Sequence, residues 1–150
     1  MSEVVIRPIR REDFDDWLPL WRGYLTFYKT EIADEVTRMT FARFFDAYEP
    51  VHAFVAERDG RLTGLVHYLY HRNTWMLAPV CYLQDLFTSA EARGQGAGRA
   101  LIEAVYAAAR EAGSSRVYWM TQEDNAQARI LYDKIADRSG FIQYRKALET

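Results

Sequence analysis

The chain has 150 residues, of which 49% are apolar and 15% aromatic, and its formal net charge is −2 at pH 7. This composition is sufficient for one packed core and excludes a disordered chain. The mixed charges exclude the basic stripe of a nucleic-acid binder, and no apolar run approaches the roughly 20 residues that span a membrane. We expect one domain over residues 1–150, with neither nucleic-acid nor membrane partners.

The cysteine content and the N-terminus bear on the cellular compartment. Cys81 is the single cysteine, so no disulfide can form within the chain, and a reducing compartment is the simpler interpretation. Residues 1–10 show neither the apolar run nor the cleavage site of a signal peptide. We expect a cytoplasmic protein. Cys81 lies within an apolar strand pattern, which is more typical of a buried small hydrophobe than of a nucleophile.

The first part of the chain predicts a strand and two helices. Residues 4–8 are typical of a short strand, and apolar residues between Phe14 and Tyr28 recur at intervals of three and four, which predicts a helix. Pro19 lies inside that pattern, so we expect a kink or a late helix start there. A second short helix is predicted over residues 40–48.

The middle of the chain predicts three strands, over residues 51–57, 62–71 and 80–88. Asp59-Gly60 between the first two is typical of a hairpin turn, because glycine accepts the positive φ that such turns need. In the third strand, Asp85 lies among apolar neighbours and is expected on the same face as Leu83 and Phe87.

The last part predicts two further helices and two strands. An amphipathic pattern follows residue 98 and ends at Gly113, and residues 117–121 form a strand pattern. Asn125 is predicted to cap a helix that Gly140 breaks, and residues 141–146 are predicted as a last strand. The order β-α-α-β-β-β-α-β-α-β indicates an α+β (α/β) fold with a mixed sheet flanked by helices.

Three glycines alternate at Gly94, Gly96 and Gly98, between a predicted strand and a long helix. Positions without side chains let backbone N–H groups surround an anion, and the following helix directs its positive dipole end to the same point. Arg93 and Arg99 add positive charge. The natural ligand of such a turn is a diphosphate.

Several interpretations of this turn remain open. A P-loop is excluded because no Gly-Lys-Ser/Thr closes the turn. A dinucleotide-binding turn needs Gly-x-Gly-x-x-Gly after an early strand and an acid that ends a second strand, whereas here the turn lies late and residues 111–115 are a helix end. A strand-to-helix turn that is merely rich in glycine, and a nucleotide-binding α/β protein, stay as alternatives.

Two motifs in this sequence resemble the GCN5-related N-acetyltransferases, the GNAT superfamily. Arg93-Gly94-Gln95-Gly96-Ala97-Gly98 matches the signature Arg/Gln-x-x-Gly-x-Gly/Ala, and Asn125-Ala126-x-Ala128-x-x-Leu131-Tyr132 resembles the second signature. The stretch Tyr82–Phe87 resembles the family's splayed fourth strand. The resemblance covers the whole chain in order and size, and it implies a GNAT fold with a mixed, mostly antiparallel sheet of six to seven strands.

Within the superfamily, the chain resembles the fungal histone and polyamine N-acetyltransferase branch, to which D-amino-acid acetylating relatives belong. The segments that carry this resemblance are Leu20–Tyr28, Arg43–Asp46, Thr74-Trp75, Val117–Thr121 and Phe141–Tyr144.

The resemblance implies that acetyl-CoA lies in a wedge between two parting strands, one ending at Leu86-Phe87-Thr88 and the other at Thr121. Backbone groups of Leu86 and Thr88 would pair with the pantetheine arm, and a backbone N–H would bind the thioester oxygen. The pyrophosphate would be held by Arg93, Gly94, Gln95, Gly96, Ala97, Gly98 and Arg99. Asn125, Ala128 and Tyr132 would contact the cofactor near its thiol end.

The resemblance further implies direct attack of an amine on the thioester. The amine must first be neutral, and a carboxylate can remove its proton. Asp85 is the first candidate for this base and Glu123 the second, although Asp85 also suits a structural acceptor and Glu123 a solvated loop. Tyr132 matches the family's proton donor to the CoA thiolate. Its position on an apolar helix face is equally typical of a core tyrosine.

The acceptor end of the site would be lined by aromatic residues, which suit the alkyl chain and charge of an amine. The candidates are Tyr24, Phe27, Tyr28, His71 and Trp75, although aromatic residues at helical spacing are often core. His67 and His71 lie on one strand face without acid partners, so we expect no metal site.

Three further questions stay open at this point. The acceptor is a polyamine, an amino acid, a peptide lysine or another small amine. A non-catalytic acyl-CoA-binding sensor on the same fold is the alternative to an enzyme. Similar proteins pair through their last strand, so residues 141–146 predict a homodimer.

Overall fold

The computed structural model describes residues 3–149; the parts of the predictions above that concern residues 1, 2 and 150 lie outside it. The chain divides into two compact units, one up to Met120 and one from Thr121 onward, and each is described by itself. The single domain predicted for residues 1–150 stays a prediction.

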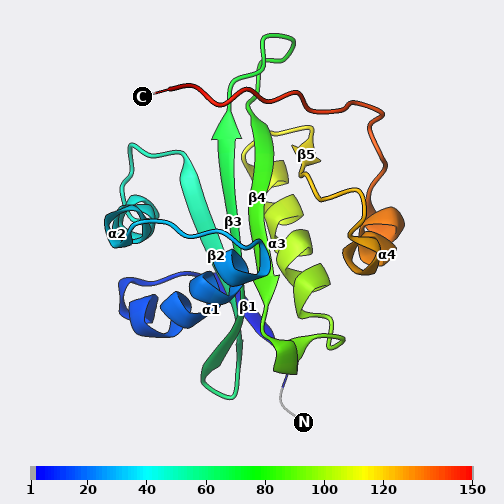
Figure 1. The fold of residues 1–150 in the computed structure, drawn as a ribbon. Helices are drawn as coiled ribbons and strands as arrows, with labels where there is room; N and C mark the ends of the chain where they lie inside the picture. Colours follow the sequence, from blue (N-terminus) through cyan, green and yellow to red (C-terminus); the bar gives the residue numbers. More distant parts are fainter. Residues whose placement is uncertain (1–2, 150) are drawn as a thin grey trace. The chain divides into compact units, whose positions relative to one another are not determined.

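The first unit is built on a five-stranded sheet of order β1-β2-β3-β4-β5 (Figure 1). The strands are β1 (Val5–Pro8), β2 (Val51–Arg58), β3 (Arg61–His71), β4 (Val80–Thr88) and β5 (Val117–Tyr118). The first four pair antiparallel and β5 runs parallel to β4. The predicted mixed, mostly antiparallel sheet is confirmed, with five strands in place of six to seven.

Three helices and two 3-10 turns accompany the sheet: η1 (Arg11–Asp13), α1 (Phe14–Phe27), α2 (Asp34–Arg43), η2 (Ala90–Ala92) and α3 (Ala97–Glu111). Helix α1 begins at Phe14 and runs through Pro19, so the predicted late start is wrong. The prediction of a helix over residues 40–48 is also wrong in its bounds. Helix α2 starts at Asp34-Glu35, where acidic side chains favour the positive end of the helix dipole.

Helices α1 and α3 cover opposite faces of the sheet. Leu65 of β3 belongs to the core formed with Trp17, Trp21 and Phe41 of α1 and α2. Its neighbour Gly64 faces α3, because a Cβ placed there would lie 3.1 Å from a Leu101 methyl carbon. Successive strand residues point to opposite faces, so the sheet separates an α1–α2 face from an α3 face (Figure 1).

The second half of the chain differs from the prediction in two places. The strand predicted over 117–121 is only β5, and residues 141–146 form no strand. Phe141 and Tyr144 are both 89% exposed. A strand needs the backbone groups of a neighbouring strand, and an alternating sequence does not supply them. The predicted homodimer is not tested by this single chain and stays a prediction.

The second unit contains α4 (Ala126–Ile135). Its predicted cap is confirmed, since the Asn125 side chain accepts a hydrogen bond from the Ala128 backbone N–H at 3.4 Å. The helix ends before Gly140. Among the helices of residues 3–149, none is both long and apolar enough to cross a membrane.

An ion cluster of Arg7, Asp13 and Glu57 connects β1, η1 and β2. The Arg7 guanidinium donates to Asp13 Oδ2 at 2.8 Å and Oδ1 at 2.9 Å, and to Glu57 Oε2 at 2.6 Å. Asp13 also accepts the Arg10 backbone N–H at 2.7 Å. The hydrogen bond from Arg7 is the main reason why the pKa of Asp13 lies below its usual value of 3.8.

We predict that Asp13→Asn lowers the free energy of unfolding at pH 7 by about 1–3 kcal/mol, because charge-assisted hydrogen bonds are lost. Since folding lowers the pKa of Asp13, its contribution is present above the unfolded pKa of 3.8 and is lost as the pH falls through the folded value. Urea unfolding of both proteins at pH 7 and near pH 3 measures this. A difference that is the same at both values would contradict the assignment.

Candidate active site

One extra residue in β4 decides which side chains reach the α1–α2 face of the sheet. His67 of β3 pairs with Asp85, whereas the next residue, Tyr68, pairs with Leu83, so Gln84 forms a β-bulge. Neighbouring residues of β3 point to opposite faces, and therefore Asp85 and Leu83 do too. The predicted shared face of Asp85 and Leu83 is wrong, and its shared face with Phe87 is confirmed.

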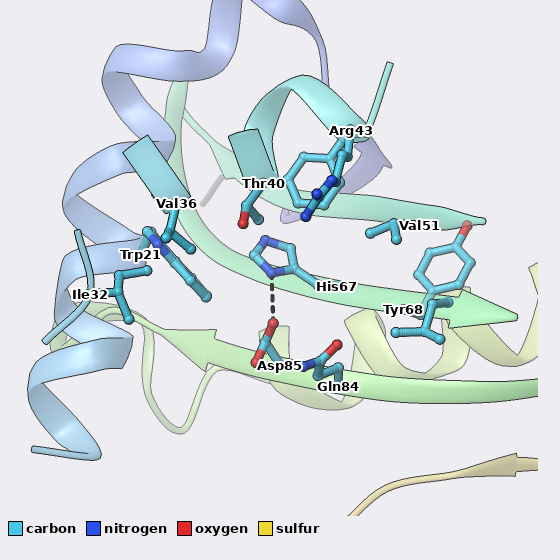
Figure 2. Close-up of a pocket in the computed structure, with 12 residues that line it drawn as sticks. Trp21, Ile32, Val36, Thr40, Arg43, Val51, His67, Tyr68, Gln84 and Asp85 are labelled. Carbon is cyan, nitrogen blue, oxygen red and sulfur yellow. Dashed lines mark hydrogen bonds and ion pairs between the residues drawn. The ribbon is translucent and has the colours of Figure 1, made fainter. Parts of the chain in front are cut away.

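Asp85 ends a buried chain of hydrogen bonds. The Trp17 indole Nε1 donates to His67 Nε2 at 3.1 Å, and His67 Nδ1 lies 3.0 Å from Asp85 Oδ2 (Figure 2). An indole N–H only donates, so Nε2 accepts and the imidazole proton lies on Nδ1, where it is donated to Asp85. The side chains of His67 and Asp85 are 3% and 12% exposed. His67 is therefore a neutral donor that orients the carboxylate.

Two of the predicted acceptor residues also surround Asp85. Tyr24 donates a hydrogen bond to Asp85, and its ring stacks on Trp21 with centroids 5.3 Å apart. Burial, and then the nearby Asp85 charge, raise the pKa of both Tyr24 and Tyr28 above the usual value of 10.0. Both hydroxyls therefore stay protonated near neutral pH, and Tyr24 stays a donor to the carboxylate.

The other three predicted acceptor residues lie apart from Asp85. The Phe27 side chain is 53% exposed at the end of α1, and Trp75 is 88% exposed in the loop after β3. His71 Nε2 lies 2.8 Å from the Tyr118 hydroxyl, and it is four residues along β3 from His67. The structure brings His71 to β5 rather than to Asp85.

A cavity of about 310 Å³ opens beside Asp85 on the α1–α2 face. Its wall is mostly apolar and aromatic, with a few polar groups, and it consists of Trp21, Ile32, Val36, Thr40, Arg43, Phe44, Val51, His67, Tyr68, Leu69, Gln84 and Asp85 (Figure 2). None of the five predicted acceptor residues lines it. Sequence reasoning missed Arg43 and the role of His67, since both depend on pairing and packing rather than on a local motif.

The edge of β4 beyond the bulge is the place predicted for the pantetheine arm. The Ser89 N–H donates to the Thr63 carbonyl at 2.8 Å, which fixes the alternation of the β3–β4 ladder. By that alternation, the backbone groups of Phe87 face β3, and those of Leu86 and Thr88 point away from it. Strand β5 pairs with β4 only at Cys81 and Tyr82. The edge carrying Leu86 and Thr88 thus extends past the end of β5.

The side chains of Phe87 and Cys81 are used in packing. A Cβ on Gly23 of α1 would lie 2.9 Å from the Phe87 ring, so this ring fills the space that the glycine leaves. Cys81 is fully buried, and burial raises the pKa of its thiol to about 11. The thiol stays protonated near neutral pH, which agrees with the prediction of a small hydrophobe.

The glycine turn has the backbone that an anion cradle needs. Gly94 and Gly96 have φ of +79° and +85°, and Gly96 precedes α3 directly. A Cβ on Gly94, Gly96 or Gly98 would meet no atom within 4 Å, so space for a ligand lies beside the backbone. The start of the 15-residue helix α3 faces this turn. These features fit a pyrophosphate.

Side chains around the turn hold its shape. Gln95 Nε2 donates to the Glu91 carbonyl at 3.0 Å, and its Oε1 accepts from Arg58. Arg99 pairs with Glu103 at 3.0 Å on the exposed side of α3. Arg93 follows η2, and Ala97 is buried as the first residue of α3.

The remaining predicted site residues belong to the second unit. Asn125 Nδ2 donates to Thr121 Oγ1 at 3.4 Å, in addition to its capping bond to Ala128. The Glu123 carbonyl accepts from Arg129 at 2.6 Å, and Tyr132 lies in α4. The functions of these residues stay predictions. Over residues 3–149 there is no group of three or more His, Cys, Asp or Glu that could hold a metal ion.

Comparison with known proteins decides the family. The pattern of the acetyltransferase (GNAT) family matches residues 11–136. The chain belongs to this family. The D-amino-acid N-acetyltransferase HPA3 of Saccharomyces cerevisiae is 37% identical over 147 residues, which cover 97% of this chain and 91% of that protein.

Solved acetyltransferases share the fold. A probable acetyltransferase has a TM-score of 0.85 at 25% identity, with 97% of this chain and 99% of that chain covered. The aminoglycoside N-acetyltransferase AAC(6')-Iy, solved with CoA, has a TM-score of 0.83 at 20% identity over 99% and 97% of the two chains. The predicted GNAT fold, N-acetyltransferase class and acetyl-CoA cofactor are confirmed at the level of the family.

We predict that Gly96→Ala weakens CoA binding on the order of 10-fold, because a left-handed alanine costs about 1–2 kcal/mol and shifts the turn. Isothermal titration calorimetry measures the Kd. Gly113→Ala is the control, since Gly113 also has a positive φ of +84° but follows the C-terminal end of the 15-residue helix α3, whose other end carries the turn. Gly98→Ala, which the family signature tolerates, should bind CoA as the wild type does. Equal affinity in Gly96→Ala would contradict the cradle.

Proposed function

We propose that this acetyltransferase moves an acetyl group from acetyl-CoA directly to a primary amine, such as that of a polyamine, an amino acid or a lysine-like side chain. The observation that carries this proposal is the setting of Asp85. Its carboxylate is held by His67 and Tyr24 on the α1–α2 face, and it lies on β4 one residue before Leu86. A proton acceptor and the open strand edge are thus adjacent.

Acetyl-CoA is bound by β4 and by the glycine turn. The backbone groups of Leu86 and Thr88 complete their hydrogen bonds with the pantetheine amides. The turn from Arg93 to Arg99 holds the pyrophosphate by backbone N–H groups and charge. Acetyl-CoA supplies the acetyl thioester, whose C–S bond breaks as the amide C–N bond forms.

Two proton transfers then accompany the reaction, one from the ammonium group and one to the CoA thiolate. A lysine-like ammonium has a pKa near 10.4, so well under about one per cent of it is neutral at pH 7. Asp85 accepts the ammonium proton, directly or through water, because a carboxylate has about four acceptor positions and His67 and Tyr24 occupy two. Glu123 is the second candidate for this task. The CoA thiolate leaves with a proton from Tyr132, an assignment that rests on the family signature.

The name of the yeast relative bears on the acceptor. A D-amino-acid N-acetyltransferase at 37% identity supports an amino acid among the acceptors of this chain. We also propose a cytoplasmic homodimer, which is supported by the buried free thiol of Cys81 and by the exposed apolar side chains of Phe141, Ile142 and Tyr144 within residues 141–146.

A CoA-release assay with a panel of polyamines, amino acids and lysine peptides tests the proposed function. The proposal expects turnover with at least one class, and mass spectrometry identifies the acetylated product. Acetyl-CoA binding without turnover across the panel would contradict the enzyme and support a non-catalytic acyl-CoA sensor.

We predict that Tyr132→Phe retains CoA affinity and lowers kcat on the order of 100-fold or more, because the thiolate loses its proton donor. Steady-state kinetics and calorimetry measure the two quantities separately. Phe141→Leu in the same unit is the control for a general effect of substitution. Unchanged kcat in Tyr132→Phe would remove this residue from the mechanism.

A further inference from the structure

The cavity beside Asp85 carries opposite charges at two of its walls. Arg43 is the cation and Asp85 the acid among the residues that line it, and His67 is neutral because Trp17 donates to its Nε2. Arg43 comes from the end of α2 and Asp85 from β4. Figure 2 shows the Arg43 side chain on one side of the His67 ring and the Asp85 carboxylate on the other. A ligand that lies along the His67 ring and reaches both side chains meets a positive and a negative end.

The Asp85 end suits an ammonium group. Its Oδ2 accepts from His67, and Tyr24 adds a second donor, so the carboxylate is fixed in place with acceptor positions remaining. Gln84 adds a polar group beside Asp85, and Thr40 of α2 adds one on the other side of the His67 ring (Figure 2).

The Arg43 end suits a carboxylate. The guanidinium has five N–H donors in a planar fork that matches a carboxylate. Arg43 forms an ion pair with Glu49, in which the distance of 3.7 Å from Nε to Oε1 is longer than a hydrogen bond. The side chains of Arg43 and Glu49 are 49% and 37% exposed, and such exposed ion pairs contribute little stability, so a ligand carboxylate competes with a weak contact.

The remaining walls are apolar. They carry no charge and consist of Ile32 before α2, Val36 of α2, Val51 of β2 and the Trp21 ring. A volume of about 310 Å³ is at the lower end of small-molecule pockets, which span about 300–1,000 Å³. Such a space suits a molecule of amino-acid size with an uncharged side chain.

We infer that this cavity is the acceptor subsite and that its ligand is an α-amino acid with an apolar side chain, whose carboxylate binds Arg43 and whose amine faces Asp85. The inference rests on the proposed function and deepens it. A polyamine fits less well, because Arg43 repels its second ammonium group. In the reaction the ammonium nitrogen loses two protons and gains the acetyl group as the thioester C–S bond breaks. One proton goes to Asp85, and the second replaces the proton that Tyr132 gives to the CoA thiolate, so that CoA leaves as the thiol.

The test compares acceptors that differ only in the carboxylate. Wild-type kcat/KM is measured for both enantiomers of methionine and phenylalanine, and for 3-(methylthio)propylamine and 2-phenylethylamine, which lack the acid. For the better enantiomer we expect a preference over the matching amine on the order of 10- to 100-fold, as for a charge-assisted hydrogen-bonded pair.

Substitution of Arg43 makes the test specific. In Arg43→Gln the ratio of kcat/KM for the amino acid over its matching amine should fall toward 1, through a higher KM for the amino acid. Arg43→Lys should retain part of the ratio. Arg38→Gln is the control, since Arg38 is on the same helix, is 65% exposed and pairs with Asp34. Its ratio should equal that of the wild type.

The outcomes separate this inference from the proposed function. Turnover of the amines at rates equal to or above those of the amino acids, or an unchanged ratio in Arg43→Gln, would overturn the amino-acid subsite and leave the acetyltransferase intact. Turnover of no compound here and in the wider amine panel, with acetyl-CoA bound, would overturn both.

Discussion

The β-bulge at Gln84 is the constraint on which the rest of the site depends. Because β4 has one residue more than β3 at this point, Asp85 pairs with His67 and turns toward α1 and α2, while Leu83 turns to the α3 face. The same extra residue determines which residues of β4 direct their backbone N–H and C=O groups toward β3. The backbone groups of Leu86 and Thr88 therefore point to the edge that β5 does not reach. One local irregularity thus positions both a carboxylate and a free strand edge.

The carboxylate at this bulge is kept in place by a helix. A buried carboxylate is costly unless it is hydrogen-bonded, and here His67 and Tyr24 donate to it. His67 is in turn held by Trp17, and both Trp17 and Tyr24 belong to α1. The packing of α1 on the sheet and the orientation of Asp85 are therefore parts of one network. This network explains why a tryptophan in the core also carries a polar contact.

Local sequence patterns predicted the elements and caps that depend on residues close together in the sequence. The strand over residues 80–88, the helix after the glycine turn and the cap at Asn125 each follow from neighbours in the sequence. The bulge does not, since it is defined by pairing with another strand. Arg43 was missed for a related reason, because the helix predicted over 40–48 concealed that α2 ends at this residue. The failed strand over 141–146 shows that alternation without a partner edge is insufficient.

The open edge of β4 is proposed to pair with the acetyl donor, and amide hydrogen exchange followed by NMR measures this pairing residue by residue. Saturating CoA should slow the exchange of the Leu86 and Thr88 amides. The Phe87 amide, which faces β3, changes far less and is the internal control. If the Leu86 and Thr88 amides exchange at the same rate with and without CoA, the edge of β4 does not pair with the cofactor.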